Sequence, residues 1–255
     1  GHTDIFSPYG SGGFVGQGEL DGLHAALEHL ARDEGWVASY LIRHPTLGVD
    51  EPRETSHVSY IMPLKGDLLA LMSPRRRAQV RKTTLDLVTD EALTIPAFLE
   101  LYDQHLARVD ASPVYHFGSS TLMRWCEHPQ IHLLGARGAG GEIESVVMVA
   151  EGDCGEYLLM AANSSGKRWA APLLYQGFLL LQRRGCPEVN LGGGIRGHDG
   201  VAEFKRRFGA RPTPTFRCRE IFDSERYDAL CSRAGVGSAD TAYFPAYHQR
   251  REEAA

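Results

Sequence analysis

A lysine between two phenylalanines, shortly after a run of glycines, is the strongest candidate for chemistry in this chain. Lys205 lies between Phe204 and Phe208, and the run Gly192–Gly194 precedes it. Glycines carry no Cβ, so a ligand or another chain can approach their backbone closely. On a helix the two phenylalanines lie one turn apart and would anchor the lysine and partly desolvate it. An ammonium held in this way stabilises developing negative charge, so Lys205 is a candidate catalytic group. An amphipathic surface lysine is the commoner case for a single lysine, and the spacing alone leaves both interpretations open.

The second candidate is a basic helix in a chain that is acidic overall. Ser73 and Pro74 are typical of a helix start, with a hydroxyl N-cap and a proline at the first position. Five of the eight residues 75–82 are Arg or Lys. Arg77 and Arg81 are four apart and share a face, where like charges repel. Guanidinium groups match phosphate oxygens, so the segment predicts a phosphate site, with a solvated basic face as the alternative.

The other reactive side chains form no catalytic or metal-binding pattern. The five cysteines are an odd number without a CxxC spacing, which indicates reduced, buried thiols rather than a zinc site, disulfides or nucleophiles; they are Cys126, Cys154, Cys186, Cys218 and Cys231. The eleven histidines contain no HExxH spacing. His198, close to the glycine run, is either a polar turn residue or a proton relay. We therefore expect no metal.

Composition is that of a packed globular protein. The chain has 255 residues, a formal net charge of −5 and 43% hydrophobic side chains, which excludes disorder, collagen and coiled coil. Its length fits one large domain or two small ones. No run approaches the ~20 apolar residues of a membrane span, and the start lacks the apolar core of a signal peptide. We expect a cytoplasmic protein without a membrane partner.

The order of predicted elements indicates an α/β (α+β) fold of the GNAT acyltransferase type. Residues 1–18 are expected to form turns, and the tail past Ser232 has little pattern. Between them the periodicity predicts, in order, a helix over 20–34, strands over 37–42 and 57–62, helices from Ser73 and from Thr94, strands over 130–136, 143–151 and 156–162, a helix over 170–184, a strand over 188–191, a helix over 204–208 and a strand over 215–222.

Three segments together resemble the Fem-type (FemX/FemAB) aminoacyl-tRNA-dependent transferases. They are Ser-Pro-Tyr-Gly-Ser-Gly-Gly from Ser7, Arg-x-x-x-Arg-Lys from Arg77, and Leu-Gly-Gly-Gly…Asp-Gly-Val…Phe-Lys-Arg-Arg-Phe-Gly from Leu191 to Gly209. Members of this family contain two GNAT-like halves. The resemblance implies a truncated N-terminal half with the basic helix over 1–110, a complete C-terminal GNAT-like domain over 111–235, and a tail over 236–255.

The resemblance also implies roles for individual residues. Lys205 would stabilise the tetrahedral intermediate or the leaving ribose oxygen of the tRNA. The tRNA phosphates would be bound by Arg75, Arg77, Arg81, Lys82 and Arg206. The substrate pocket would include Tyr9, Gly193, Gly194, Arg196 and Tyr175, although Tyr175 at the start of the long helix also fits a core position.

The reaction implied is transfer of an amino acid, alanine among the options, from tRNA to the free amine of a peptide. The ester of a charged tRNA is already activated, so alignment and oxyanion stabilisation suffice without a cofactor. The expected partners are charged tRNA and a peptide acceptor, free or on a carrier protein, and short relatives act in antibiotic biosynthesis. An acyl-CoA-dependent N-acyltransferase is the main alternative, although the loop over 163–168 lacks the second small residue of a pyrophosphate cradle. A non-catalytic RNA-binding module is the other.

Overall fold

The computed structural model describes residues 2–7, 10–12, 22–47, 54–111, 115–193, 200–239 and 243–249. Two compact units are present, one made of residues 1–57 and 214–255 and the other of residues 58–213. The strands β3 (Glu54–Pro63) and β9 (Arg211–Ile221) each run from one unit into the other along the chain. These units are the parts of the chain that are compact in space. The expected division, into GNAT-like halves over 1–110 and 111–235 and a tail over 236–255, describes a repeat of the fold and stays a prediction.

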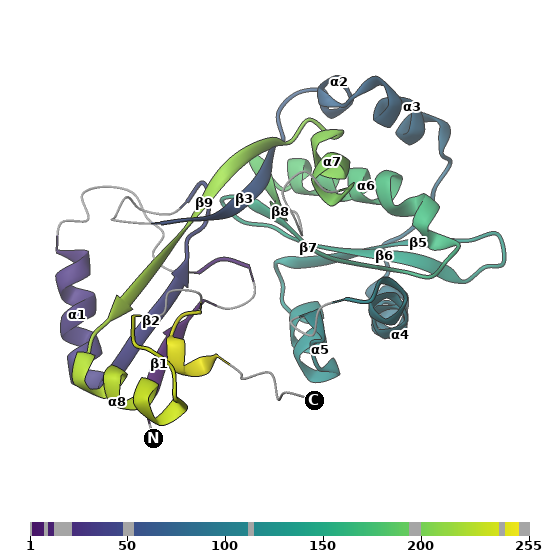
Figure 1. The fold of residues 1–255 in the computed structure, drawn as a ribbon. Helices are drawn as coiled ribbons and strands as arrows, with labels where there is room; N and C mark the ends of the chain where they lie inside the picture. The colour runs from purple at the N-terminus through teal and green to yellow at the C-terminus, as the bar shows by residue number, and fades with distance from the viewer. Residues whose placement is uncertain are drawn as a thin grey trace. The chain divides into compact units, whose positions relative to one another are not determined.

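The unit of residues 58–213 is built on a mixed sheet (Figure 1). Its strand order is β3, β8 (Glu188–Gly193), β7 (Gly155–Ala162), β6 (Ile143–Ala150), β5 (Ile131–Arg137) and β4 (Asp86–Val88). Strands β5, β6 and β7 form the predicted antiparallel meander. Strand β8 pairs in parallel with β7 at Val189 and Asn190, and antiparallel with β3 as far as Gly193. Among the described residues, the carboxyl end of β8 is therefore paired with β3 and not with β7.

Helices cover both faces of this sheet (Figure 1). One face carries α4 (Glu91–Val109) and α5 (Ser119–Cys126), whose apolar side chains form a core with β5, β6 and β7. The other carries α6 (Ala170–Arg183), together with α2 (Leu68–Leu71), α3 (Pro74–Lys82) and α7 (Gly200–Arg206). The buried stripe of α4 includes Phe98, Leu101, Tyr102 and Leu106, as its helical spacing predicts.

The other unit contains β1, β2 and most of β9, which belong to the same nine-stranded sheet. Strand β1 (Thr3–Phe6) pairs in parallel with β2 (Trp36–Ile42), and β2 pairs antiparallel with β9. Helix α1 (Leu23–Glu34) ends at Gly35, as predicted, in the left-handed region at φ 65°. Helix α8 (Ser224–Ala234) and the 3₁₀ turn η3 (Ala246–His248) supply Tyr227, Cys231 and Ala246 to the core.

The strands and helices expected from periodicity are confirmed, with four corrections. The helix expected over 204–208 is α7, which begins at Gly200 and ends at Arg206, so that Phe208 lies in the turn that follows it. Residues 3–6 form β1 rather than a turn, because the short strand obtains its hydrogen bonds from β2. Helix α4 begins at Glu91 rather than near Thr94, since the Asp90 carboxylate caps it by accepting from the Ala92 amide at 3.0 Å. Helices α2, α5 and α8 and strand β4 were not expected, because each is short or only partly apolar.

All five cysteines are free and buried, as predicted. Burial raises the pKa of the Cys126 thiol to about 11 and also raises the pKa of Cys231. Both thiols are therefore protonated at neutral pH and poor nucleophiles. Across the described part of the chain, none of the helices combines the length and apolar composition of a membrane span.

Candidate functional site

Lys205 is held at the end of a central strand. Its side chain lies on α7 and is 6% exposed. The Nζ donates a hydrogen bond of 2.5 Å to the carbonyl oxygen of Gly193, the last residue of β8. A buried ammonium is stable only where polar partners replace water. The expectation of a fixed, desolvated lysine beside the glycine run is confirmed, while its catalytic role stays a prediction.

The backbone near Lys205 is shaped by Asn190 and Gly192. The Asn190 Oδ1 accepts from the Gly192 amide at 2.9 Å, and its Nδ2 donates to the Glu156 carboxylate on β7 at 3.3 Å. Gly192 has φ +70°, a conformation that favours glycine. A Cβ at this position would lie 3.6 Å from the Lys205 Nζ. This is an ordinary van der Waals separation, so glycine is favoured at position 192 by its backbone conformation rather than by the ammonium.

The two phenylalanines anchor α7 as predicted. Phe208 is fully buried, with its ring centroid 5.3 Å from that of Phe204 and 5.2 Å from that of Phe178 on α6. Both aromatic–aromatic contacts have near-perpendicular rings, a favourable geometry. Helix α7 is thus fixed against α6 on both sides of Lys205 in sequence, which limits the movement of the ammonium.

Arg76 on the basic helix α3 packs against α7, the helix that carries Lys205, and this role was not predicted from the sequence. Its guanidinium carbon lies 4.4 Å from the ring centroid of Phe204 and 4.5 Å from that of Phe208, and Nη2 donates to the Phe204 carbonyl at 3.4 Å. Burial lowers the pKa of Arg76 to about 10, with Arg207 and Arg75 adding repulsion. A signal was present: Met72, Arg76 and Val80 have i, i+4 spacing and form the buried face of this segment.

The predicted phosphate-binding residues of α3 fall into two groups. Arg75, Arg81 and Lys82 are exposed. Arg77 is half-buried, and its Nη2 donates to the carbonyl oxygens of Ala70 at 3.3 Å and Met72 at 3.1 Å. The Arg77 guanidinium therefore holds the end of α2, which leaves Arg75, Arg81 and Lys82 as the charges presented to solvent.

Arg206 and Tyr175 also have structural contacts. The Arg206 Nη2 donates to the Tyr60 hydroxyl at 3.0 Å, and Nη1 lies 3.7 Å from a Glu203 carboxylate oxygen. Tyr175 is half-buried on α6. Burial raises its pKa, the Asp67 carboxylate adds to this, and Arg81 opposes it. Tyr175 therefore lies on a helix, α6, that packs against α3.

Three predicted pocket residues, Tyr9, Gly194 and Arg196, lie outside the described residues, as does His198. Part of the motif from Ser7 is visible: the Ser7 Oγ accepts from the Ile42 amide at 2.7 Å, and Gly12 forms a parallel bridge with Arg43.

Arg43 is a second residue that the sequence analysis missed. It is 3% exposed, and within the described residues neither Nη1 nor Nη2 has a hydrogen-bond partner. An unpaired buried guanidinium costs several kcal/mol, which marks Arg43 as a candidate group for binding an anion. The only sequence signal is a single arginine at the end of an apolar strand, too common to be informative.

The loop over 163–168 already holds an anion of the protein itself. The Glu144 carboxylate accepts from the Arg168 Nη2 at 2.9 Å and from the Trp169 Nε1 at 2.7 Å, next to the start of α6. The Asn163 Oδ1 accepts from the Gly166 amide at 2.8 Å. Arg168 and one loop amide are thus engaged within the protein, which weakens the loop as a pyrophosphate cradle.

Gly209 sets the packing of α7 on α2 and provides a test of it. It has φ +94°, and a Cβ would lie 2.5 Å from the Leu71 carbonyl oxygen. We expect Gly209→Ala to lower the free energy of unfolding by at least about 2 kcal/mol, from backbone strain plus this clash. Gly185→Ala is the matched control, with φ +88° and open space around the Cβ. Urea denaturation measures both, and equal losses would show that the Leu71 contact is unimportant.

The fold that carries this site is the GNAT-like acyltransferase fold, as predicted. A solved structure of FemX matches with a TM-score of 0.65 at 13% sequence identity, over 82% of this chain and 78% of that one. L-PGS from Bacillus licheniformis matches with a TM-score of 0.54 at 14% identity, over 85% and 79% of the two chains.

A third match is the C-terminal domain of a protein assigned as a lysylphosphatidylglycerol synthetase from Agrobacterium fabrum. Its TM-score is 0.51 at 15% identity, over 88% of this chain and 83% of that one. No protein-family model and no curated protein matches the sequence. At these identities the matches establish the fold alone.

Proposed function

We propose that this chain is an aminoacyltransferase that moves an amino acid from charged tRNA to the free amine of a peptide. The observation that carries the proposal is the buried Lys205 ammonium at the end of β8, on a helix that packs directly against the basic helix α3 through Arg76. A polyanion docked on α3 would thus lie beside the group that stabilises the reacting ester.

The proposed reaction needs no cofactor. The amine nitrogen of the acceptor attacks the ester carbonyl, the new C–N bond forms, and the bond from the carbonyl carbon to the ribose oxygen breaks. The proton lost by the amine ends on that ribose oxygen. Lys205 would stabilise the negative charge on the tetrahedral intermediate or on the leaving oxygen, and alignment of the two substrates would supply much of the remaining acceleration.

The proposed docking surface for tRNA consists of Arg75, Arg81 and Lys82, with Arg77 and Arg206 adding charge nearby. Such contacts position an RNA by its phosphates without reading its sequence. Gly193 would line the pocket for the aminoacyl end, and Tyr175 on α6 would contact the incoming strand. Tyr9, Gly194 and Arg196 keep their proposed pocket roles.

Two observations support aminoacyl-tRNA over acyl-CoA as the donor. The Glu144 carboxylate engages Arg168 next to the start of α6, where it would repel a pyrophosphate. One of the matching proteins is assigned as a lysylphosphatidylglycerol synthetase, and lysylphosphatidylglycerol is an aminoacyl ester. The fold is thus shared with a protein whose assigned product carries an aminoacyl group. The chain also resembles the pacidamycin alanyltransferase PacB in size and layout, so we propose alanine as the first amino acid to test and peptide antibiotic assembly as the setting.

A single assay tests this function. The purified protein is given a total pool of aminoacylated tRNA and a panel of small peptide amines, and the products are identified by mass. We expect one amino acid to be added to an acceptor and ribonuclease to abolish the product. Full activity with acetyl-CoA in the absence of tRNA would overturn the proposal, as would tight tRNA binding without any product, which is the behaviour of an RNA-binding module.

A further inference from the structure

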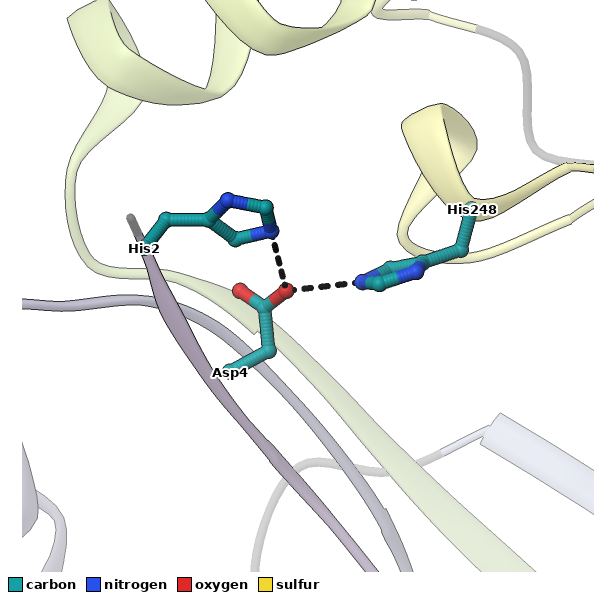
Figure 2. A group of neighbouring side chains, drawn as sticks. All are labelled: His2, Asp4 and His248. Atoms are coloured by element: carbon teal, nitrogen blue, oxygen red, sulfur yellow. Dashed lines mark hydrogen bonds and ion pairs between the residues drawn. The ribbon is translucent and has the colours of Figure 1, made fainter.

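We propose that His2, Asp4 and His248 form a binding site for a divalent transition metal ion of the zinc class. Figure 2 shows the two imidazole rings pointing toward the same carboxylate oxygen of Asp4. The His248 Nε2 lies 2.9 Å from the Asp4 Oδ2, and the His2 Nε2 lies 3.4 Å from the same oxygen. All three ligand atoms are within 4.8 Å of one another. The site lies in the unit of residues 1–57 and 214–255 and is independent of the proposed function.

These separations fit coordination by one ion. Zinc bonds to histidine nitrogen and carboxylate oxygen are about 2.0–2.1 Å long, so neighbouring ligands of a tetrahedral ion lie about 3.3 Å apart. The two nitrogen–oxygen distances, 2.9 and 3.4 Å, lie on either side of that value. Two imidazoles and one carboxylate suit zinc, cobalt, nickel or copper, whereas magnesium and calcium prefer oxygen ligands alone.

The carboxylate is oriented by the surrounding protein. The Asp4 side chain is 5% exposed, and its other oxygen, Oδ1, accepts from the Tyr247 hydroxyl at 2.7 Å and from the Ala38 amide at 3.2 Å. Burial raises the pKa of Tyr247 and the bond to Asp4 raises it further, so this hydroxyl stays a donor. Donors behind a ligating carboxylate are a regular feature of metal sites because they fix its direction.

The two histidines leave the site open to solvent. Their side chains are 31% exposed for His2 and 42% exposed for His248. An ion can therefore reach the site, and water can complete its coordination. Asp4 lies in β1, His2 directly precedes β1, and His248 belongs to η3. A bound ion would therefore tie η3 to β1. Its expected effect is structural, an increase in the stability of this unit.

The test uses the full chain without an affinity tag, treated with EDTA and then dialysed. Zinc chloride alone is titrated by calorimetry, and cobalt binding is followed by visible absorption. We expect one ion per chain and a rise in melting temperature with zinc. His248→Gln and His2→Gln should each weaken zinc binding at least tenfold and remove the zinc-dependent rise. Both positions are on the surface, so these variants should fold, whereas Asp4→Asn risks unfolding because Asp4 is buried.

His29→Gln is the matched control, since His29 forms an exposed i, i+4 pair with Asp33 that is not part of the cluster. It should bind zinc as the unchanged protein does. Equal zinc affinity in the unchanged protein and in His248→Gln would overturn the proposal. So would a loss of stability in His248→Gln that is the same with and without zinc, because the cluster would then be an ion pair only.

Discussion

Lys205→Met is expected to lower kcat for aminoacyl transfer by about 10²- to 10³-fold while changing tRNA affinity by less than about threefold. Methionine keeps the length and apolar stem of the side chain but cannot donate to Gly193 or to a developing oxyanion. The interaction lost is one that strengthens only in the transition state, so the loss belongs in kcat rather than in binding. Single-turnover rates with charged tRNA and filter binding with the uncharged tRNA measure the two effects separately.

Two further variants separate catalysis from packing. Lys205→Arg keeps the charge in a larger group, and we expect it to recover part of the rate only if the charge itself matters. Lys82→Met removes an exposed lysine from α3 and should leave the single-turnover rate of bound substrate nearly unchanged. Melting temperatures are compared throughout, because burial of Lys205 predicts some loss of stability. If kcat and tRNA affinity fall by the same factor in Lys205→Met, Lys205 is a binding residue.

The fold was predictable wherever the hydrophobic periodicity of a segment agrees with the turn and cap residues at its ends. The meander β5–β7 alternates apolar runs with glycine-rich turns, and α6 has a long apolar stripe closed by Gly185. Helix α3 was predictable from Ser73 and Pro74, and the Ser73 Oγ does accept from the Arg76 amide, at 3.3 Å. Strand β1 was not, since four residues have too little pattern and its stability comes from pairing with β2.

The site was predictable in its residue types but not in its contacts. Position 205 could be selected because Phe204 and Phe208 flank it at helical spacing. The role of Arg76 depends on a contact across 128 residues of chain, and no local pattern encodes that distance. By charge alone, Arg75, Arg76 and Arg77 are equivalent. In the structure Arg75 is exposed, whereas the Arg76 guanidinium donates to the Phe204 carbonyl and the Arg77 guanidinium donates to the Met72 carbonyl. Which cations remain for a ligand is therefore a property of packing.

Replacing Arg75, Arg81 and Lys82 together by alanine is expected to weaken tRNA binding mainly at low salt. Each phosphate contact contributes about 0.7–0.9 to the slope of log affinity against log salt. Removing three contacts should reduce that slope by about 2–3, so that between 50 and 200 mM salt the unchanged protein loses about 20- to 40-fold more affinity than the variant. The three side chains are exposed, so the melting temperature should change little.

Two single variants define what this result means. Arg183→Ala removes an exposed arginine from the last turn of α6 and should leave the salt slope unchanged. Arg77→Ala should lower stability more than affinity, because the Arg77 guanidinium donates to the Ala70 and Met72 carbonyls. An unchanged slope in the triple variant would place the tRNA elsewhere on the protein and separate α3 from the reaction. If Arg183→Ala reduced the slope by one third as much as the triple variant does, about 0.7–0.9, only net charge would attract the RNA. A docked polyanion senses the position of each cation as well as their number.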